Sequence, residues 1–349
     1  MRIALIAPPF ISVPPQKYGG TELFVAELAV ALQEEGLDVM VYANGESTVD
    51  APTRWFYEKA EWPLREDIEA SLKGINHSAW SMKDAAGEAD IIHMNNAAGL
   101  SMARFVNAPM VYTVHHAYEQ ALANFYLEFP EVSFVTISRY QQGRLAMARM
   151  RAVHHGINLS RYCLQKRKRP YLSFLGRIAP TKGTHLAIEI AKRSGVPLKI
   201  AGEIQPGFRD YWQTAIKPHV DGRFIEYVGE VGLAEKNELL GNSLAMLFPI
   251  QWDEPFGLVM IEAMACGTPV LALSGGSVEE VVQEGVSGHV RDTVEELAEC
   301  VGDLAFDAAT VRGYVEQYFS AQRMARDYIQ LYAELAGFQT DSAVEGLVA

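Results

Sequence analysis

The chain is poor in cysteine. Its three cysteines, Cys163, Cys266 and Cys300, form no CxxC pair and lack the spacing of a zinc site or a disulfide framework. Isolated thiols are typical of a reducing compartment, so we expect a cytoplasmic protein. No acidic DxD-like motif stands out as a metal ligand. We therefore expect chemistry that needs neither a metal ion nor a bound cofactor.

Long apolar runs are also missing. The N-terminus, MRIALIAPPF, has one arginine and a short apolar run broken by Pro8 and Pro9. This run is too short for a signal peptide and predicts a first strand. The most apolar internal stretch, 255–273, is interrupted by Glu262. We expect no membrane span and at most peripheral contact with a membrane.

Positive charge is scarce, because 30 basic residues face 43 acidic ones and the formal net charge is −13. A chain this acidic is not built to bind nucleic acid and has no broadly basic face for an anionic membrane. One basic run occurs at 166–169, directly before Pro170. It could contact a lipid or polyanion, but its position between two structured halves favours a solvated linker.

Two common nucleotide-binding fingerprints do not occur. GxGxxG does not follow the first expected strand, and GxxxxGK[ST] is absent. These absences exclude a dinucleotide-binding loop and a Walker loop in their usual form.

Short apolar runs alternating with helical patterns are what the chain does have. The runs are apolar on both faces, as in buried parallel strands, and helical patterns such as 22–35, 185–194 and 258–266 lie between them. This alternation predicts a doubly wound α/β fold, and 349 residues exceed the usual size of one core. The expected strands are 3–7, 39–42, 91–93, 110–114, 134–137, 171–175, 198–201, 225–228, 244–248 and 269–273.

The two halves divide at 161–170, where the apolar residues follow neither the period of a strand nor that of a helix. We predict a Rossmann-like domain over 1–160 and a second one over 161–349. The stretch 321–335 has the pattern of an amphipathic helix. Such a helix can pack on its own domain, pack back on the N-terminal domain or join two copies in a homodimer. Residues 338–349 show no pattern.

The most informative stretch is 249–269, PIQWDEPFGLVMIEAMACGTP. It predicts the end of a strand, a loop carrying Glu254 and a helix that begins near Gly257. That helix is apolar except at Glu262, and a buried carboxylate needs hydrogen-bond donors. The free amides of Gly257 and Leu258 lie between the two acids, at the positive end of the helix dipole. Carboxylates that bind hydroxyls, beside amides that bind anions, suit a ligand that is both sugar and phosphate.

Other unusual residues follow expected strands, where ligands gather in parallel sheets. Gly19 and Gly20 precede a helix and permit close approach of a phosphate or sugar, although glycines often serve only as turn residues. His115 and His116 follow the strand 110–114 and can meet a substrate or act as structural residues. A second pair, His154–His155, favours a structural or hinge role.

The loop GRIAPTKG, 176–183, offers two cations, Arg177 and Lys182, between glycines. They suit a diphosphate, whose charge they would offset, whereas the alternative is a solvated surface loop.

Taken together, GRIAPTKG and EPFGLVMIEAMACGTPV resemble nucleotide-sugar glycosyltransferases of family four, which have the GT-B fold. GGTE at 19–22, VHH at 114–116, ISRY at 137–140 and HHGIN at 154–158 extend the resemblance to the first half. The resemblance implies two Rossmann-like domains that face a cleft and close over a nucleotide sugar. The acceptor then binds mainly to the N-terminal domain.

On the donor side, the resemblance implies that Arg177 and Lys182 hold the diphosphate. Glu254 is expected near the donor sugar hydroxyls, and Glu262 at the ribose. The segment 228–231, with Val231, would lie along the base. The backbone amides expected to meet phosphate or sugar are those of Phe256, Gly257 and Leu258.

On the acceptor side, His115 matches a family histidine near the reacting centre, and Gly20 matches the glycine loop. We expect His115, Arg177, Lys182 and Glu254 to be the catalytic residues. Two departures from the family lie toward the acceptor side or hinge. Many relatives carry His-Asp where this chain has His115–His116, and Pro-Asn-Gly at 154–156.

The resemblance implies a hexosyltransferase that retains the anomeric configuration. No catalytic nucleophile is evident, so we favour front-face attack, with the leaving diphosphate accepting the proton. A UDP-sugar is favoured as donor, and GDP-mannose remains an alternative. The acceptor is left open between a sugar, a lipid-linked glycan and a small molecule. Two rival functions are a nucleotide-sugar epimerase of the same fold and a non-catalytic nucleotide-sugar-binding protein.

Overall fold

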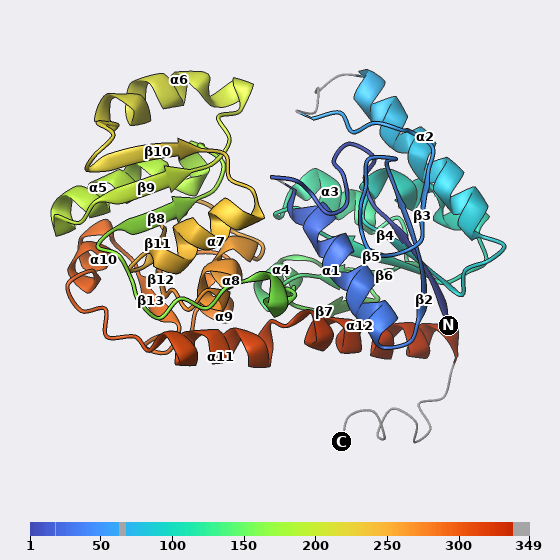
Figure 1. Ribbon diagram of the computed structural model, residues 1–349. Coiled ribbons are helices and arrows are strands. Elements are labelled where there is room, and N and C mark those ends of the chain that lie inside the picture. Colours follow the sequence, from blue (N-terminus) through green and yellow to red (C-terminus); the bar gives the residue numbers. More distant parts are fainter. Residues whose placement is uncertain (18, 63–67, 338–349) are drawn as a thin grey trace.

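The chain forms two α/β domains, each built on its own parallel sheet (Figure 1). The computed structural model describes residues 1–17, 19–62 and 68–337. The first sheet contains β1 (Arg2–Ile6), β2 (Asp38–Ala43), β3 (Thr53–Trp55), β4 (Ile91–Met94), β5 (Met110–Val114), β6 (Ser133–Thr136) and β7 (Met150–Ala152). The second contains β8 (Leu172–Leu175), β9 (Leu198–Ala201), β10 (Ile225–Gly229), β11 (Met246–Phe248), β12 (Val270–Leu273) and β13 (Gly288–Arg291).

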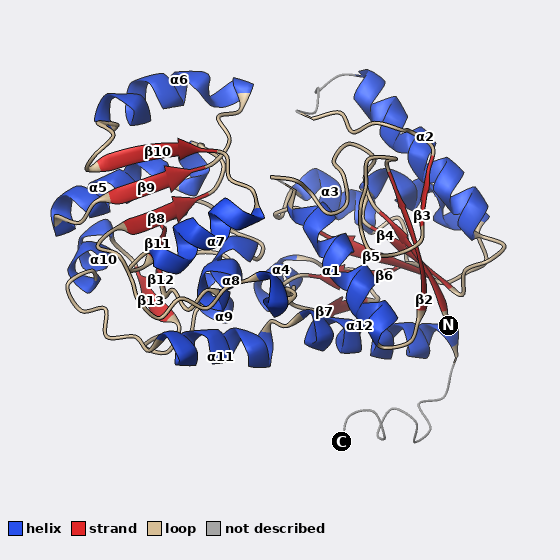
Figure 2. Cartoon of the chain, viewed as in Figure 1, coloured by secondary structure: helices blue, strands red, loops and turns tan. Residues whose placement is uncertain are grey.

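In each sheet, the strands that follow the first one along the chain are added first on one side of it and then on the other, as in doubly wound folds. The first sheet runs β3-β2-β1-β4-β5-β6-β7 and the second β10-β9-β8-β11-β12-β13. Helices cover the sheets on both sides (Figure 2). They are α1 (Gly20–Glu34), α2 (Ile68–Ala85), α3 (Gln120–Tyr126), α4 (Arg139–Arg144), α5 (Thr184–Ser194), α6 (Arg209–Tyr211), α7 (Leu233–Asn242), α8 (Leu258–Ala265), α9 (Val278–Val281), α10 (Val294–Cys300), α11 (Ala308–Tyr318) and α12 (Ala321–Ala336).

The predicted architecture of two doubly wound parallel sheets is confirmed. Every expected strand is present, within two residues at either end. The sequence missed β3, β7 and β13, which all lie at sheet edges. An edge strand is covered on fewer sides, so its residues are partly exposed and lack the continuous apolar run that marked the others.

The chain crosses from the first sheet to the second between β7 and β8. The basic run 166–169 lies in this segment and is exposed except at Lys168. The Lys168 ammonium is half-buried and donates to the Gly241 carbonyl at 2.8 Å and to Thr268 Oγ1 at 2.7 Å. The interpretation of the whole run as a solvated linker is therefore wrong for Lys168, which ties this segment to α7.

The last helix returns to the first domain. Figure 1 shows α11 beneath the second domain and α12 continuing beneath the first. The buried face of α12, with Met324, Tyr328 and Tyr332, joins the core between α1 and the first sheet. This face is occupied within the chain, so it is not available for the homodimer that the sequence left open. Residues 338–349, which showed no pattern, lie outside the described residues.

A series of buried, hydrogen-bonded side chains fixes α12 to the sheet. His93 on β4 is within hydrogen-bond distance of the Tyr332 hydroxyl, at 2.6 Å, and of Thr113 Oγ1, at 2.7 Å. Thr113 in turn meets the Tyr328 hydroxyl at 2.8 Å. Burial lowers the pKa of His93 to about 3, so the imidazole is neutral at physiological pH.

We expect acid to weaken the fold through His93. Its folded pKa lies below its ordinary value of 6.5, so only the unfolded chain takes up the proton as pH falls below about 6.5. Between about pH 7 and pH 5 this costs about 2 kcal/mol. In denaturant unfolding, the free energy of unfolding should fall between pH 7 and pH 5 by about 2 kcal/mol more in wild type than in His93→Gln. The exposed His219 is the control: His219→Gln should follow wild type, and an unchanged slope in His93→Gln would contradict the prediction.

Within the described part of the chain, no helix combines the length and apolar character needed to cross a bilayer.

Candidate active site

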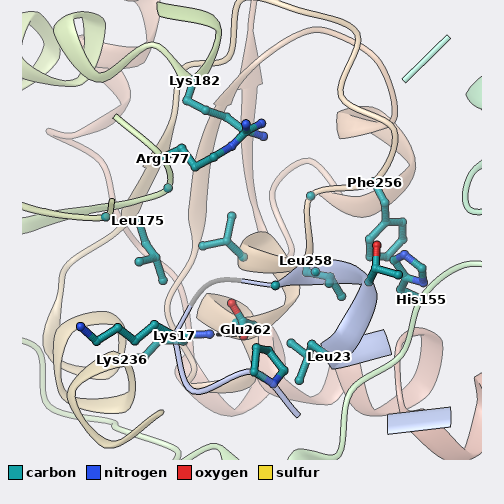
Figure 3. A pocket seen from close by; sticks show the side chains of 18 of the residues that line it. Lys17, Leu23, His155, Leu175, Arg177, Lys182, Lys236, Phe256, Leu258 and Glu262 are labelled. Carbon is teal, nitrogen blue, oxygen red and sulfur yellow. Dashed lines mark hydrogen bonds and ion pairs between the residues drawn. The ribbon is translucent and has the colours of Figure 1, made fainter. Parts of the chain in front are cut away.

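A cavity of about 580 Å³ lies between the two domains, at the carboxyl ends of their strands. Loops after β1, β5, β8 and β11 reach it, because parallel strands present their carboxyl ends at one edge of a sheet. Ten residues expected from the sequence to form the site line this cavity. They are Gly20, His115, Arg177, Lys182, Val231, Glu254, Phe256, Gly257, Leu258 and Glu262. Arg177, Lys182, Phe256, Leu258 and Glu262 are labelled among them in Figure 3. Val228, expected beside Val231, is not among the lining residues.

Two helix N-termini meet in the cavity. Helix α1 begins at Gly20 and α8 at Leu258, and a Cβ on Gly20 would lie 3.7 Å from Leu258 Cδ1. Gly257 has φ +81, a backbone conformation that favours glycine, and precedes the first turn of α8. Free amides and the positive ends of two helix dipoles therefore face one space, which suits an anion.

The cation Lys182 is paired in the structure. Its ammonium contacts the Glu254 carboxylate and lies 4.7 Å from the centre of the Trp252 ring. Trp252 Nε1 also donates to Glu254 Oε2 at 2.8 Å. The sequence treated Lys182 and Glu254 as separate ligands and missed Trp252. Both side chains are largely buried, so each charge depends on the other. Arg177 lies beside Lys182 in Figure 3.

The carboxylate of Glu262 has two donors of its own. Its Oε1 accepts from the Tyr162 hydroxyl at 2.9 Å and from Lys236 Nζ at 2.6 Å. The sequence anticipated that a carboxylate in this apolar helix needs partners but did not identify them. Lys236 and Tyr162 also line the cavity.

Another buried carboxylate, that of Glu27 on α1, was missed altogether. It accepts from Arg161 Nη1 at 2.8 Å and from the Asn158 amide at 2.6 Å, so it anchors the segment between the domains to the first domain. The signal that pointed to Glu262, an acid in an apolar helix, applies equally to Glu27.

Of the two histidines after β5, His115 is partly buried in the cavity wall and His116 is exposed. His115 Nε2 meets Asn95 Oδ1 at 2.9 Å, and the His115 ring stacks on His155 with centroids 5.7 Å apart. Burial lowers the pKa of His155 to about 3 and that of His115 well below its usual value. Both rings are therefore neutral at physiological pH, so His115 can donate or accept a hydrogen bond but carries no charge.

The structure gives the remaining histidines different positions from those that the sequence suggested. His155 lines the cavity, whereas a structural or hinge role had been favoured for it. His154 does bridge the domains, because its Nε2 lies 2.8 Å from Glu280 Oε2 on α9. His116 lines the cavity beside His115.

No group of three or more metal-ligating side chains occurs in residues 1–17, 19–62 and 68–337. The expectation of metal-independent chemistry stays a prediction.

Comparison with known proteins identifies the family. The model for glycosyltransferase family 4 matches residues 18–161, and the model for glycosyl transferases group 1 matches 162–308. The chain belongs to glycosyltransferase family 4. It is an enzyme that transfers glycosyl groups, as the resemblance of its motifs predicted.

The relatives of this family 4 enzyme have varied names. It is 26% identical to a glycogen synthase of Mycobacterium tuberculosis, over 93% of this chain and 89% of that protein. It is 25% identical to a D-inositol 3-phosphate glycosyltransferase of Mycobacterium marinum, over 93% and 82%.

Solved structures show the same fold. Sucrose-phosphate synthase of Thermosynechococcus elongatus superimposes with a TM-score of 0.78 at 20% identity, over 96% of this chain and 99% of that one. HepE of Anabaena, in complex with UDP and glucose, has a TM-score of 0.76 at 18% identity, over 96% and 100%. The fold is GT-B, as expected.

Proposed function

We propose that this enzyme transfers a hexose from a nucleotide sugar to an acceptor hydroxyl with retention of the anomeric configuration. The layout of the cavity between the domains carries the proposal. Arg177, Lys182 and the N-termini of α1 and α8 suit a diphosphate, whereas the buried carboxylate of Glu262 suits the hydroxyls of a ribose.

A UDP-sugar is the favoured donor, and GDP-mannose is the alternative. The likeness to HepE, which has been solved with UDP-glucose, supports the first choice. Val231, two residues after the end of β10, is proposed to border the base. The acceptor remains open between a sugar, a lipid-linked glycan and a small molecule. The action is proposed to take place in the cytoplasm without a cofactor, and the absence of a disulfide among Cys163, Cys266 and Cys300 agrees with a reducing compartment.

The proposed chemistry is a front-face displacement. The acceptor oxygen bonds to the anomeric carbon on the face from which the diphosphate leaves, and a diphosphate oxygen takes the hydroxyl proton. Arg177, Lys182 and the helix amides stabilise the charge that develops on the leaving group. Glu254 is held by Lys182 and Trp252, so its proposed role is to orient the sugar hydroxyls near the neutral His115.

A thermal-shift screen of nucleotides, followed by product analysis with the matching sugars, tests this function. Transfer, or slow hydrolysis of the donor without an acceptor, supports a glycosyltransferase. An epimerised sugar recovered from donor alone would instead identify an epimerase. Tight donor binding without any turnover would indicate a binding protein.

Glu262→Gln should weaken nucleotide binding by about tenfold or more, because a charged acceptor of ribose hydrogen bonds becomes a neutral amide. Isothermal calorimetry with UDP and GDP measures the effect. Glu226, an acid on β10 that is paired with Lys199 and lies outside the cavity, provides the control. Glu226→Gln should bind as wild type does, whereas equal affinity of wild type and Glu262→Gln would count against the ribose contact.

A further inference from the structure

Lys236 is a largely covered cation to which the sequence assigned no role. It lies on α7, lines the cavity and leaves 15% of its side chain exposed, while its partner Glu262 leaves 4% exposed. In Figure 3 the Lys236 side chain runs toward Glu262, apart from Arg177 and Lys182. Lys236 therefore lies in a part of the cavity separate from the loop that carries Arg177 and Lys182, which is proposed to bind the diphosphate.

The two side-chain donors of Glu262 bind only one of its two carboxylate oxygens. Both the Lys236 ammonium, at 2.6 Å, and the Tyr162 hydroxyl, at 2.9 Å, bind the same oxygen, Oε1. No hydrogen bond to Oε2 is found in the part of the chain that the structure describes. Two donors on one oxygen fix the plane and rotamer of the carboxylate and leave the second oxygen able to accept from a ligand.

We propose that Lys236 is a positioning residue that holds Glu262 ionised and oriented so that its second oxygen accepts a ribose hydroxyl, and that Lys236 thereby sets the preference for ribonucleotide over deoxyribonucleotide donors. This inference rests on the proposed function, in which Glu262 meets the ribose. Without Lys236, Glu262 would be a buried carboxylate without a cation, so it would take up a proton or turn toward another donor.

The test compares the affinities of UDP and 2′-deoxy-UDP by calorimetry. Wild type should bind UDP about tenfold or more tightly than 2′-deoxy-UDP, because the latter lacks one hydroxyl donor to a carboxylate. In Lys236→Gln the preference should fall to about twofold or less, through weaker binding of UDP alone. Lys236→Arg keeps the charge and should retain most of the preference.

Lys168 provides a matched control. It is a lysine that ties the linker to Gly241 on α7 and to Thr268, but it does not line the cavity. Lys168→Gln should lower the melting temperature and keep the UDP preference. A purely structural role of Lys236 would make Lys236→Gln behave in the same way, which would overturn the proposal. Equal losses for both nucleotides would overturn it too, because Lys236 would then only attract the diphosphate.

A titration of wild type keeps the proposal testable if Lys236→Gln does not fold. The ionisable groups around Glu262 are Lys236, Tyr162, Arg161, Glu27 and Cys266. With the ammonium in place, the UDP preference should stay constant from about pH 8 to pH 6. A preference that disappears over that range would show that Lys236 does not keep Glu262 ionised. A wild type with no preference at any pH would instead remove the ribose contact of the proposed function.

Discussion

Lys182→Ala is expected to lower kcat by about 10²- to 10³-fold, because it removes a cation that offsets the charge developing on the leaving diphosphate. The substitution also removes the ammonium from the buried Glu254 carboxylate, which keeps Trp252 Nε1 as a donor, so the donor sugar loses an oriented partner as well. Binding of uridine, which has no phosphate, should not change. Steady-state kinetics and calorimetry with uridine and UDP separate the two effects.

The control for this variant is Lys199→Ala. Lys199 lies on β9 in an exposed pair with Glu226 and does not line the cavity. Its loss should leave turnover unchanged. An undiminished kcat in Lys182→Ala would remove the proposed mechanism.

Gly183→Ala should destabilise the fold by about 3 kcal/mol or more. Gly183 has φ +71 at the start of α5, and a Cβ there would lie 1.8 Å from the Pro249 carbonyl oxygen. The backbone after β11 would therefore have to move, and this backbone leads to Glu254. Denaturant unfolding measures the loss.

Gly195 is a closely matched comparison at the other end of α5. It has φ +70, nearly the same conformation, but a Cβ there meets nothing within 4 Å. Gly195→Ala should cost only about 1 kcal/mol, the price of a left-handed residue with a side chain. Similar losses at the two positions would show that the contact with Pro249 does not restrict Gly183.

The comparison of these glycines refines the interpretation of GRIAPTKG. The sequence associated the loop with a diphosphate, and Arg177 and Lys182 do line the cavity. Its last glycine, however, is required by the close approach of two backbones. A glycine pattern alone does not distinguish space for a ligand from space for another part of the chain, because both need the absence of a Cβ.

The candidate site was largely predictable because its residues follow strands. Carboxyl ends of parallel strands converge, so residues such as His115 and Arg177, distant in the sequence, are brought to one cavity by topology alone. Lys236 was not predictable in this way. It sits within a helix whose sequence, LAEKNELLGN, has the charges of an ordinary exposed surface, and nothing local indicates that Glu262 is its partner.

By itself the sequence determined the alternation of strands and helices, the division into two sheets and the edge at which polar residues gather. These features follow from local patterns of apolar residues and from the direction of parallel strands. Only the tertiary structure decided the pairing of charges, Lys182 with Glu254 and Lys236 with Glu262, and the return of α12 to the first domain. Burying a charge or an apolar face requires a partner, but the physical requirement does not specify where in the chain that partner lies.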